Sequence, residues 1–384
     1  MKIVFFARKM PDLCGAFLHD IDLATELQRR GHQVAFMTIH AGPEGVNGGI
    51  YRGFRYMKYT AGMTALESSE LWICPHSPIL PDVRKINSRN FNRPIVATCH
   101  FDGNYTAISG LADRSIAPEM LFFINGIMEK NYRSNIIPWP RTIRRTEVIR
   151  PILHRDAIEI LEPFAGDCIT LVNANQNKGV HVFLDLARRM PDRKFLGVLP
   201  YYGERQIPPA PSNVEWIPFT DDIRAVLKRT RVLLFSSYYE SFGRIAVEAM
   251  LNGIPVLYSK PLDKSMYPGG STEGVDEWIR PVGISCERER PESWMEALAT
   301  LDDADVYAST SLASKAHINA MNLFTEASRI AGMVESFARE NPVIIRTQSV
   351  EAKPQGQTSA TPRFQEPAAA VGFSLASGRL RIRR

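Results

Sequence analysis

Residues 232–258 read VLLFSSYYESFGRIAVEAMLNGIPVLY, and this stretch decides the fold. The apolar run predicts a buried strand over residues 231–236, followed by a polar loop up to Ser241. Gly243 then opens a predicted helix over residues 244–252, and a second strand follows over residues 254–258. A strand, a loop, a helix and another strand in this order are typical of a parallel α/β sheet.

The start of the helix after Gly243 is a candidate binding site for a phosphate group. A helix N-terminus offers free backbone N–H groups and the positive end of the helix dipole. Glu240 precedes this helix and Glu248 lies within it. Carboxylates accept hydrogen bonds from hydroxyl groups, so both side chains are suited to a sugar or a ribose.

The same alternation of strands and helices extends in both directions, which predicts two parallel, doubly wound sheets facing a cleft. Ligands of such sheets bind beyond the carboxyl ends of the strands. We expect residues 115–128 to be helical or buried, and Thr220 to be the N-cap of a helix. The other predicted strands are residues 2–7, 33–39, 71–74, 94–98, 167–173, 194–199 and 213–217, and the other predicted helices are residues 17–30, 178–190 and 221–228.

The length of 384 residues predicts two domains and a tail. We place an N-terminal Rossmann-like domain in residues 1–150 and a C-terminal one in residues 151–311. Residues 312–340 form a predicted helical stretch that returns to the N-terminal domain. The segment 341–384 is rich in Pro, Gln, Ser, Thr and Ala, and we expect it to be disordered.

Charge and cysteine usage exclude several classes of protein. The net charge is +5, and residues 341–384 hold seven basic and two acidic residues, so the rest of the chain is neutral. A basic nucleic-acid-binding body is therefore disfavoured. Five scattered cysteines without a C-x-x-C pair disfavour a disulfide framework or a zinc cluster and favour the cytoplasm. The apolar run Ile3–Ala7 is too short for a signal peptide.

The central stretch resembles the motif of family 4 retaining glycosyltransferases. Glu240 and Glu248 are separated by seven residues, with Ser241-Phe242-Gly243 after the first glutamate. The resemblance implies the GT-B fold, in which two Rossmann-like domains enclose a nucleotide-sugar cleft. Residues 1–150 would then be the acceptor-side domain, and residues 151–311 the nucleotide-sugar-binding domain. It implies that Glu248 holds the ribose hydroxyls and Glu240 contacts the donor sugar or its leaving group. It also places Ser241 at the donor, and the amides of Phe242 and Gly243 at the diphosphate.

Residues 171–180 read LVNANQNKGV and resemble the phosphate-binding segment of that family. Lys178 matches a cation that binds the diphosphate, although it also suits a solvated helix start. The arginine of the family pattern is absent, because residues 173–177 supply only amides and Ala174. Arg244 or Arg205 is the expected replacement.

Other expected site residues follow from the same resemblance. Gly15 would approach the donor phosphates, and His100, at a strand end, would contact the donor sugar. Trp216 would border the nucleobase pocket. His100 equally fits a partly buried structural histidine and Trp216 a core tryptophan, while His19 fits a structural role better than a functional one. Asp102 is a weaker candidate than His100.

The resemblance implies a metal-independent, retaining glycosyltransferase with a nucleotide-sugar donor as co-substrate and no further cofactor. A donor phosphate oxygen would accept the proton of the acceptor hydroxyl. The D-x-D triplets at Asp20 and Asp303 are common by chance and are not assigned to a metal. An epimerase or phosphorylase with the same fold, or a non-catalytic sugar-nucleotide-binding protein, remains an alternative.

The sequence leaves the acceptor open among a glycan, a lipid-linked sugar, a small molecule and a modified DNA base. Arg141, Arg144 and Arg145 form a basic stretch near the domain junction. Together with the tail, this stretch suits peripheral contact with the inner face of a membrane or with an anionic polymer. The alternative is a solvated protein surface.

Overall fold

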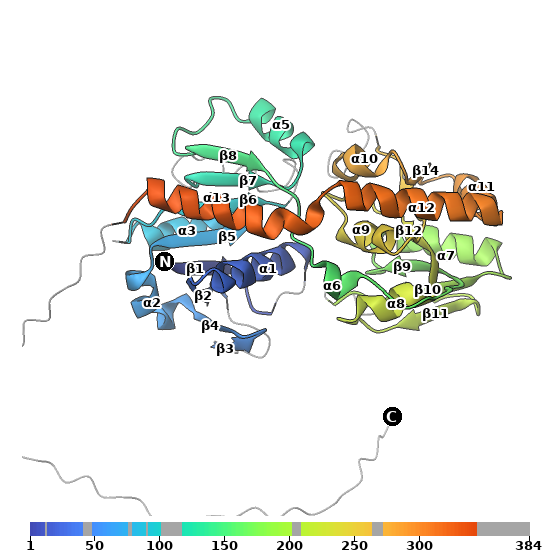
Figure 1. Ribbon diagram of the computed structural model, residues 1–384, viewed down its shortest axis with the longest axis horizontal. Helices are drawn as coiled ribbons and strands as arrows, with labels where there is room; N and C mark the ends of the chain where they lie inside the picture. Colours follow the sequence, from blue (N-terminus) through green and yellow to red (C-terminus); the bar gives the residue numbers. More distant parts are fainter. Residues whose placement is uncertain are drawn as a thin grey trace, which may run out of the picture. The chain divides into compact units, whose positions relative to one another are not determined.

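The computed structural model describes residues 1–11, 14–40, 48–75, 79–89, 91–100, 117–201, 209–262 and 272–343. Residues 1–345 form one compact unit that contains two β-sheets (Figure 1). Asp102, Arg205 and most of the predicted tail lie outside the described residues.

The first sheet has the strand order β3-β4-β2-β1-β5-β6-β7-β8. The pairings between its strands are parallel except for the hairpin of β3 with β4. In the central strand β1, Ile3 to Ala7 are buried, as expected of a parallel strand that is covered on both faces. The strands are β1 (Lys2–Ala7), β2 (Gln33–Thr38), β3 (Gly48–Tyr51), β4 (Phe54–Lys58), β5 (Leu71–Pro75), β6 (Ile95–Cys99), β7 (Met120–Phe123) and β8 (Arg145–Val148).

The second sheet has the order β11-β10-β9-β12-β13-β14, with parallel pairing throughout. Its centre is the apolar stretch Val232 to Phe235, which is buried between β9 and β13. Two parallel α/β sheets are the predicted architecture. The strands are β9 (Cys168–Val172), β10 (Lys194–Val198), β11 (Val214–Ile217), β12 (Thr230–Phe235), β13 (Val256–Ser259) and β14 (Ile284–Cys286).

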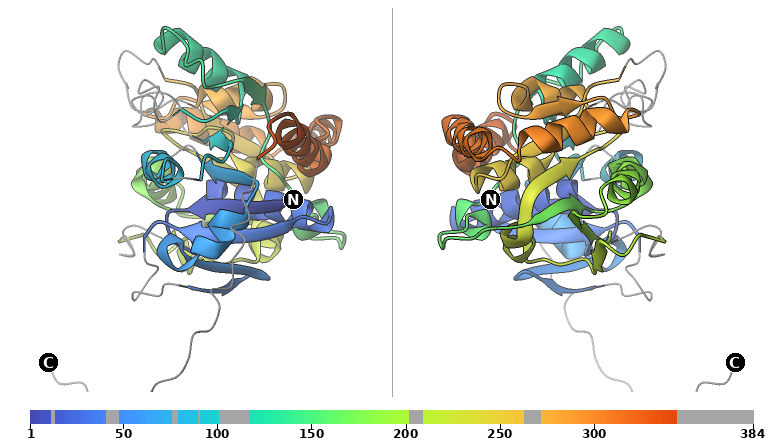
Figure 2. Two further views of the ribbon diagram at one scale, coloured as in Figure 1. Left: turned by 90° about the vertical axis from the view of Figure 1, so that its left-hand side faces the viewer. Right: turned by 90° about the vertical axis from the view of Figure 1, so that its right-hand side faces the viewer.

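Helices cover the sheets, and the last two follow one another along one side of both sheets (Figures 1 and 2). α12 packs on α9, and α13 packs on α1, where Arg30 donates a hydrogen bond to Glu335 at 2.9 Å. The helices are α1 (Gly15–Arg29), α2 (Met63–Ser68), α3 (Leu80–Asn87), α5 (Gly126–Asn135), α6 (Arg155–Ile158), α7 (Val180–Arg189), α8 (Ile223–Arg229), α9 (Arg244–Leu251), α10 (Glu273–Ile279), α11 (Pro291–Thr300), α12 (Ala304–Ala320) and α13 (Glu326–Glu340). The 3₁₀ turns are η2 (Tyr59–Ala61), η3 (Gln176–Lys178) and η4 (Leu323–Thr325).

The structure decides between the two alternatives predicted for residues 115–128, because the apolar residues Met120 to Ile124 are buried but not helical. The apolar run there is the strand β7, with Met120 paired to Val96 of β6, and α5 begins only at Gly126. A short apolar run does not distinguish a buried strand from a buried helix by its periodicity. The boundary is set by Asn125, whose side chain accepts a hydrogen bond from the Met128 amide at 2.7 Å.

Other predicted helix ends also shift. Asp222, not Thr220, caps α8, because its carboxylate accepts a hydrogen bond from the Ala225 amide at 3.3 Å. The helix predicted from Lys178 begins at Val180, after Gly179 with a left-handed φ of 77°. The terminal helical stretch consists of α12 and α13, separated by a turn in which Asn322 is left-handed.

Gly197 provides a test of the packing in the second sheet. A Cβ atom at this position would lie 2.0 Å from the Trp216 ring. Gly197→Ala should therefore lower the free energy of unfolding by about 1–3 kcal/mol, as overpacked core substitutions do. Gly332→Ala is the matched control, because nothing lies within 4 Å of the added atom in α13. Denaturant unfolding of both variants measures the difference, and equal stability would contradict the packing.

Candidate functional site

A cavity of about 630 Å³ lies between the two sheets, and both halves of the chain line it. Its volume is in the range of small-molecule sites. His100 and Ile124 line it from loops that follow strands of the first sheet, and Gly15 lines it from the start of α1. Asn173 and Ser237 line it from loops that follow β9 and β12. The cavity is therefore at the carboxyl ends of both sets of strands, where the sequence predicts the ligand.

The turn from β12 into α9 shapes one wall of this cavity. Gly243 has a φ of 80°, and a Cβ atom there would lie 2.6 Å from the ring of Phe235. A residue with a side chain would be strained at this position both in its backbone and by contact. Ser236 Oγ donates a hydrogen bond to the Lys178 carbonyl at 2.9 Å, so the loop is also joined to the segment after β9.

Lys178 and Glu240 form an ion pair across the join of these two segments. Their side chains are 21% and 15% exposed, and both residues line the cavity. The two residues that the sequence assigns to the diphosphate and to the donor sugar are therefore in direct contact. Their roles stay predictions.

Glu248 lies one turn into α9 and is partly buried at the cavity wall. Burial raises the pKa of its carboxyl group, Arg244 lowers it, and Asp22 raises it. A carboxyl group at this place can accept hydrogen bonds from hydroxyl groups of a ligand.

Phe242 combines a packing role with its place beside the cavity. Its ring is 1% exposed and stacks on Trp278 at 5.4 Å between centroids. The Trp278 indole N–H donates to the Phe242 carbonyl at 2.9 Å. The side chain therefore fixes the loop from behind, and both Ser241 and Phe242 line the cavity.

Arg244 is held by Asp22 of the N-terminal half and by Ile152 at the junction of the two halves. Its guanidinium donates to the Ile152 carbonyl at 2.8 Å and lies 3.4 Å from Asp22. His154 lies 3.5 Å from the same aspartate. Arg244 lines the cavity, but its charge is already matched by Asp22, so it is a weaker substitute for the missing arginine than the sequence suggests.

Two histidines from the first half lie under the cavity. His100 lines it and contacts His19 edge to face at 5.4 Å. His19 is 0% exposed and accepts a hydrogen bond from the Ile152 amide at 3.3 Å, so its role is structural, as expected. Gly15 begins α1 at the cavity wall, with Arg244 Cδ 3.8 Å from where its Cβ would be.

The structure places Trp216 away from the cavity lining. Its ring packs against Phe183 at 5.6 Å and over Gly197. Phe219, Thr220 and Asp221 follow in the chain and do line the cavity. Trp216 therefore fits the core tryptophan that the sequence left open as an alternative, and a nucleobase pocket beside this strand stays a prediction.

The amides of residues 173–177 stand where the family pattern has an arginine. Asn173, Asn175 and Asn177 all line the cavity. Asn173 has a left-handed φ of 64°, which asparagine tolerates better than most residues, and its Oδ1 accepts from Asn175 Nδ2 at 3.0 Å. The three asparagines are visible in the sequence. That they line the cavity becomes clear only from the structure, in which the chain turns at Asn173.

Sequence reasoning also missed Arg52. It lies at the tip of the β3–β4 hairpin with a φ of 46°, and its guanidinium is 5.7 Å from the centre of the Tyr51 ring. It lines the cavity from the first sheet, whereas Lys178 lines it from the segment after β9. No motif marks it, because its position depends on the pairing of two strands.

The basic stretch near the domain junction is largely paired. Arg145 contacts Glu147 at 3.0 Å, and Arg144 donates a hydrogen bond to Asn341. Arg141 is exposed. Within the described ranges, no helix is both long and apolar enough to cross a membrane. The same residues contain no cluster of three or more His, Cys, Asp or Glu that could hold a metal ion.

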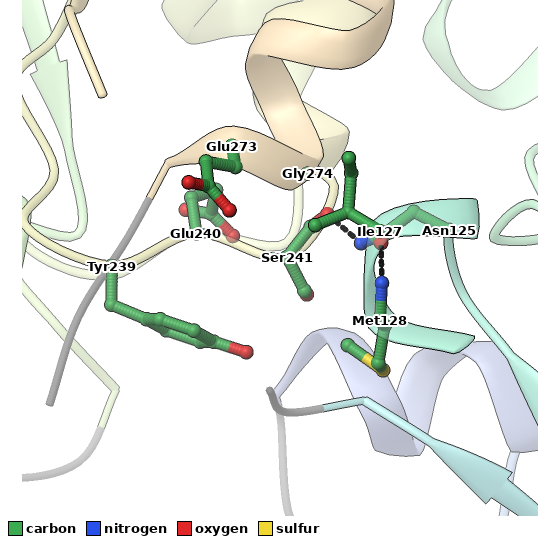
Figure 3. A pocket seen from close by; sticks show the side chains of 8 residues that line it. All are labelled: Asn125, Ile127, Met128, Tyr239, Glu240, Ser241, Glu273 and Gly274. Atoms are coloured by element: carbon green, nitrogen blue, oxygen red, sulfur yellow. Dashed lines mark hydrogen bonds between the residues drawn. The ribbon is translucent and has the colours of Figure 1, made fainter. Parts of the chain in front are cut away.

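A smaller hollow adjoins the loop 239–241 where the two halves touch (Figure 3). Glu240 and Ser241 line it from one half and Asn125 from the other. Gly274, in the first turn of α10, also lines this hollow.

The site segment matches a known family. Residues 209–301 match the Glycosyl transferases group 1 family. This range contains Glu240, Gly243 and Glu248 but not Lys178. A curated relative, the D-inositol 3-phosphate glycosyltransferase of Corynebacterium kroppenstedtii, is 27% identical over 123 residues. That alignment covers 32% of this chain and 25% of the relative's length.

Solved structures confirm the predicted GT-B fold. Sucrose-phosphate synthase from Thermosynechococcus elongatus has a TM-score of 0.68 at 13% identity, over 88% of this chain and 98% of that one. Anabaena HepE, solved in complex with UDP-glucose, has a TM-score of 0.66 at 17% identity, over 88% and 100% of the two chains. An Escherichia coli trehalose-6-phosphate structure bound with UDP-2-fluoro glucose has a TM-score of 0.60 at 11% identity, over 88% and 99%.

His19 and His154 give opposite dependences of stability on pH. The pKa of His19 lies well below its ordinary 6.5, through burial and then through His100 and Arg244. The unfolded chain therefore binds a proton below pH 6.5 that the folded chain does not. The free energy of unfolding consequently decreases as the pH is lowered through this range. His19→Asn should reduce that fall between pH 7 and 5, measured by urea unfolding at each pH.

His154→Asn is the comparison for His19. The hydrogen bond with Asp22 raises the pKa of His154 above 6.5. Its contribution is complete below pH 6.5 and is lost as the pH rises through the folded-state pKa. The difference between the wild type and His154→Asn should therefore shrink from pH 6 to 8. If the free energy of unfolding changed equally with pH in the wild type and both variants, the lowered pKa of His19 and the raised pKa of His154 would both be contradicted.

Proposed function

We propose that this protein is a retaining glycosyltransferase that moves a sugar from a nucleotide-sugar to an acceptor hydroxyl without a metal ion. The observation that carries the proposal is the contact of Lys178 with Glu240 in the large cavity, beside Glu248 and the start of α9. The match of residues 209–301 to the glycosyl transferases supports the reaction class. The UDP-sugar complexes of two proteins with the same fold support the donor class.

The donor would lie with its diphosphate between Lys178 and the first turn of α9. The ammonium group and the free amides after Gly243 stabilise the charge that develops on the leaving group. Glu248 accepts hydrogen bonds from the ribose hydroxyls, and Glu240 from the donor sugar. The asparagines at 173–177 supply neutral donors in place of a second cation.

The acceptor hydroxyl must lose a proton as the new glycosidic bond forms. In the proposed mechanism a phosphate oxygen of the leaving nucleotide takes it on the same face of the sugar, so the anomeric configuration is retained. The walls from both halves exclude water and limit hydrolysis of the donor.

A panel of UDP-, GDP- and ADP-sugars, with and without candidate acceptors, tests the function. We expect one donor to bind, slow release of free sugar without acceptor, and transfer with acceptor that persists in EDTA. NMR of the product gives the anomeric configuration. Turnover to an isomeric nucleotide-sugar without acceptor would indicate an epimerase. Binding without any turnover would indicate a non-catalytic protein.

Glu248→Ala should weaken nucleotide binding by about tenfold or more, because one or two hydrogen bonds to a charged group are lost. Isothermal titration calorimetry with the nucleoside diphosphate of the donor measures this loss of affinity. Glu215→Ala is the control, since Glu215 lies on β11 and pairs with Arg229. Unchanged affinity in a folded Glu248→Ala protein would remove this carboxylate from the site.

Lys178→Ala should reduce kcat by ~10²–10³-fold, as loss of one preorganised partner of a developing anion does. Lys178→Arg should restore part of the rate, limited by the planar geometry of the guanidinium. Lys194→Ala is the matched control, because Lys194 pairs with Asp167 at the surface. Normal turnover of Lys178→Ala would assign the diphosphate to another cation, with Arg244 tested next.

A further inference from the structure

Asn125 joins the N-terminal half of the chain to the loop that carries Glu240. Its Nδ2 donates a hydrogen bond to the Ser241 carbonyl at 2.7 Å, over 116 residues of sequence. Ser241 directly follows Glu240, and the bond lies beside the small hollow between the halves (Figure 3). Asn125 is 2% exposed, and Ser241 is partly buried.

Other anchors of the same loop come from the C-terminal half. The Tyr238 amide donates to the Asn177 carbonyl at 2.8 Å, and Arg288 donates to the Ser237 carbonyl. Trp278 holds the Phe242 carbonyl. All of these bonds lie within the C-terminal half of the chain. The bond from Asn125 instead ties the loop to the first sheet.

Asn125 is fixed at both ends of its side-chain amide. Its Oδ1 accepts the Met128 amide at 2.7 Å and caps α5, so only the NH₂ end is left to face Ser241. Aspartate could make the same cap but has no N–H to donate, and serine could cap without reaching Ser241. The pair of bonds therefore requires an asparagine in a way that helix capping alone does not.

Gly274 allows the close approach that this bond needs. A Cβ atom at Gly274 would lie 2.3 Å from the Ser241 oxygen and 2.4 Å from Asn125 Nδ2. Any side chain here would push the two groups apart. The start of α10, the loop and the cap of α5 therefore meet at a single point.

We propose that Asn125 is a positioning residue that sets the Glu240–Phe242 loop in its working geometry only when the N-terminal half is in place. This proposal rests on the proposed function, because the group positioned is the one assigned to the donor sugar. Asn125 itself does not touch the donor. It couples the approach of the acceptor-side half to the placement of Glu240.

Asn125→Asp is the decisive variant, because it keeps the cap and removes the donor. We expect kcat for transfer to fall by about 10–100-fold, as for a reacting group displaced by a fraction of an ångström to 1 Å. The Kd for UDP should stay within about twofold, since Lys178 and Glu248 are on the other half. The loss should thus fall on kcat and not on nucleotide binding.

The pH profile gives a signature that a purely structural role lacks. The new carboxyl would face the Ser241 carbonyl, with Glu240 and Glu273 lining the same hollow and Glu129 in its own helix. Glu277 lies behind Gly126 and 3.9 Å from Arg150. Burial and these carboxylates favour the protonated acid, which can donate to Ser241, whereas the Met128 amide and the start of α5 favour the charged form. The ratio of Asn125→Asp to wild-type kcat should rise as the pH falls from 8 to 6.

Controls separate this role from stability and from the proposed function. Asp303→Ala removes the cap of α12 far from the site and should lower Tm without changing kcat. Gly274→Ala should reproduce the kcat loss, whereas Gly332→Ala should not. If the wild type transfers no sugar, hydrogen exchange of residues 237–243 still tests the coupling, and it should speed up in Asn125→Asp. The proposal would be overturned if Asn125→Asp had the wild-type kcat at every pH, or if hydrogen exchange of residues 237–243 were unchanged in this variant.

Discussion

The geometry of the site depends on one backbone constraint, the left-handed turn at Gly243. Its φ of 80° and its contact with the Phe235 ring leave room for no side chain. This turn lets α9 start directly after the loop, so the free amides of the helix and Glu248 face the same cavity as Glu240. A small change in the turn would move all of these groups together.

The polar backbone groups of the loop before Gly243 are anchored by different parts of the chain. Trp278 holds it from α10, Arg288 from the segment after β14, and Asn125 from the first sheet. A buried carbonyl without a partner would be costly, so each anchor is also a stability requirement. The hydrogen bonds that hold the loop in place therefore also contribute to the stability of the surrounding fold.

The fold and the central motif were predictable, because both rest on local patterns. Buried strands, the glycine turn and the spacing of Glu240 and Glu248 can be recognised in a single stretch of sequence. The misplaced features depend on tertiary contacts. Trp216 lies on the expected strand, but the space beside Gly197 draws its ring into the core. Arg52 and Asn125 reach the site through strand pairing and domain contact, which no local pattern encodes.

Two ion pairs at the cavity match charges in the absence of a ligand. Lys178 is held by Glu240, and Arg244 by Asp22. An unpaired charge at such partly buried places would be expensive, so loss of one partner alone would destabilise the free protein. Under the proposed function, the donor's phosphate replaces Glu240 at Lys178, while its sugar hydroxyls replace Lys178 at Glu240. Binding then exchanges one set of hydrogen bonds for another, and neither charge is left bare in the course of the exchange.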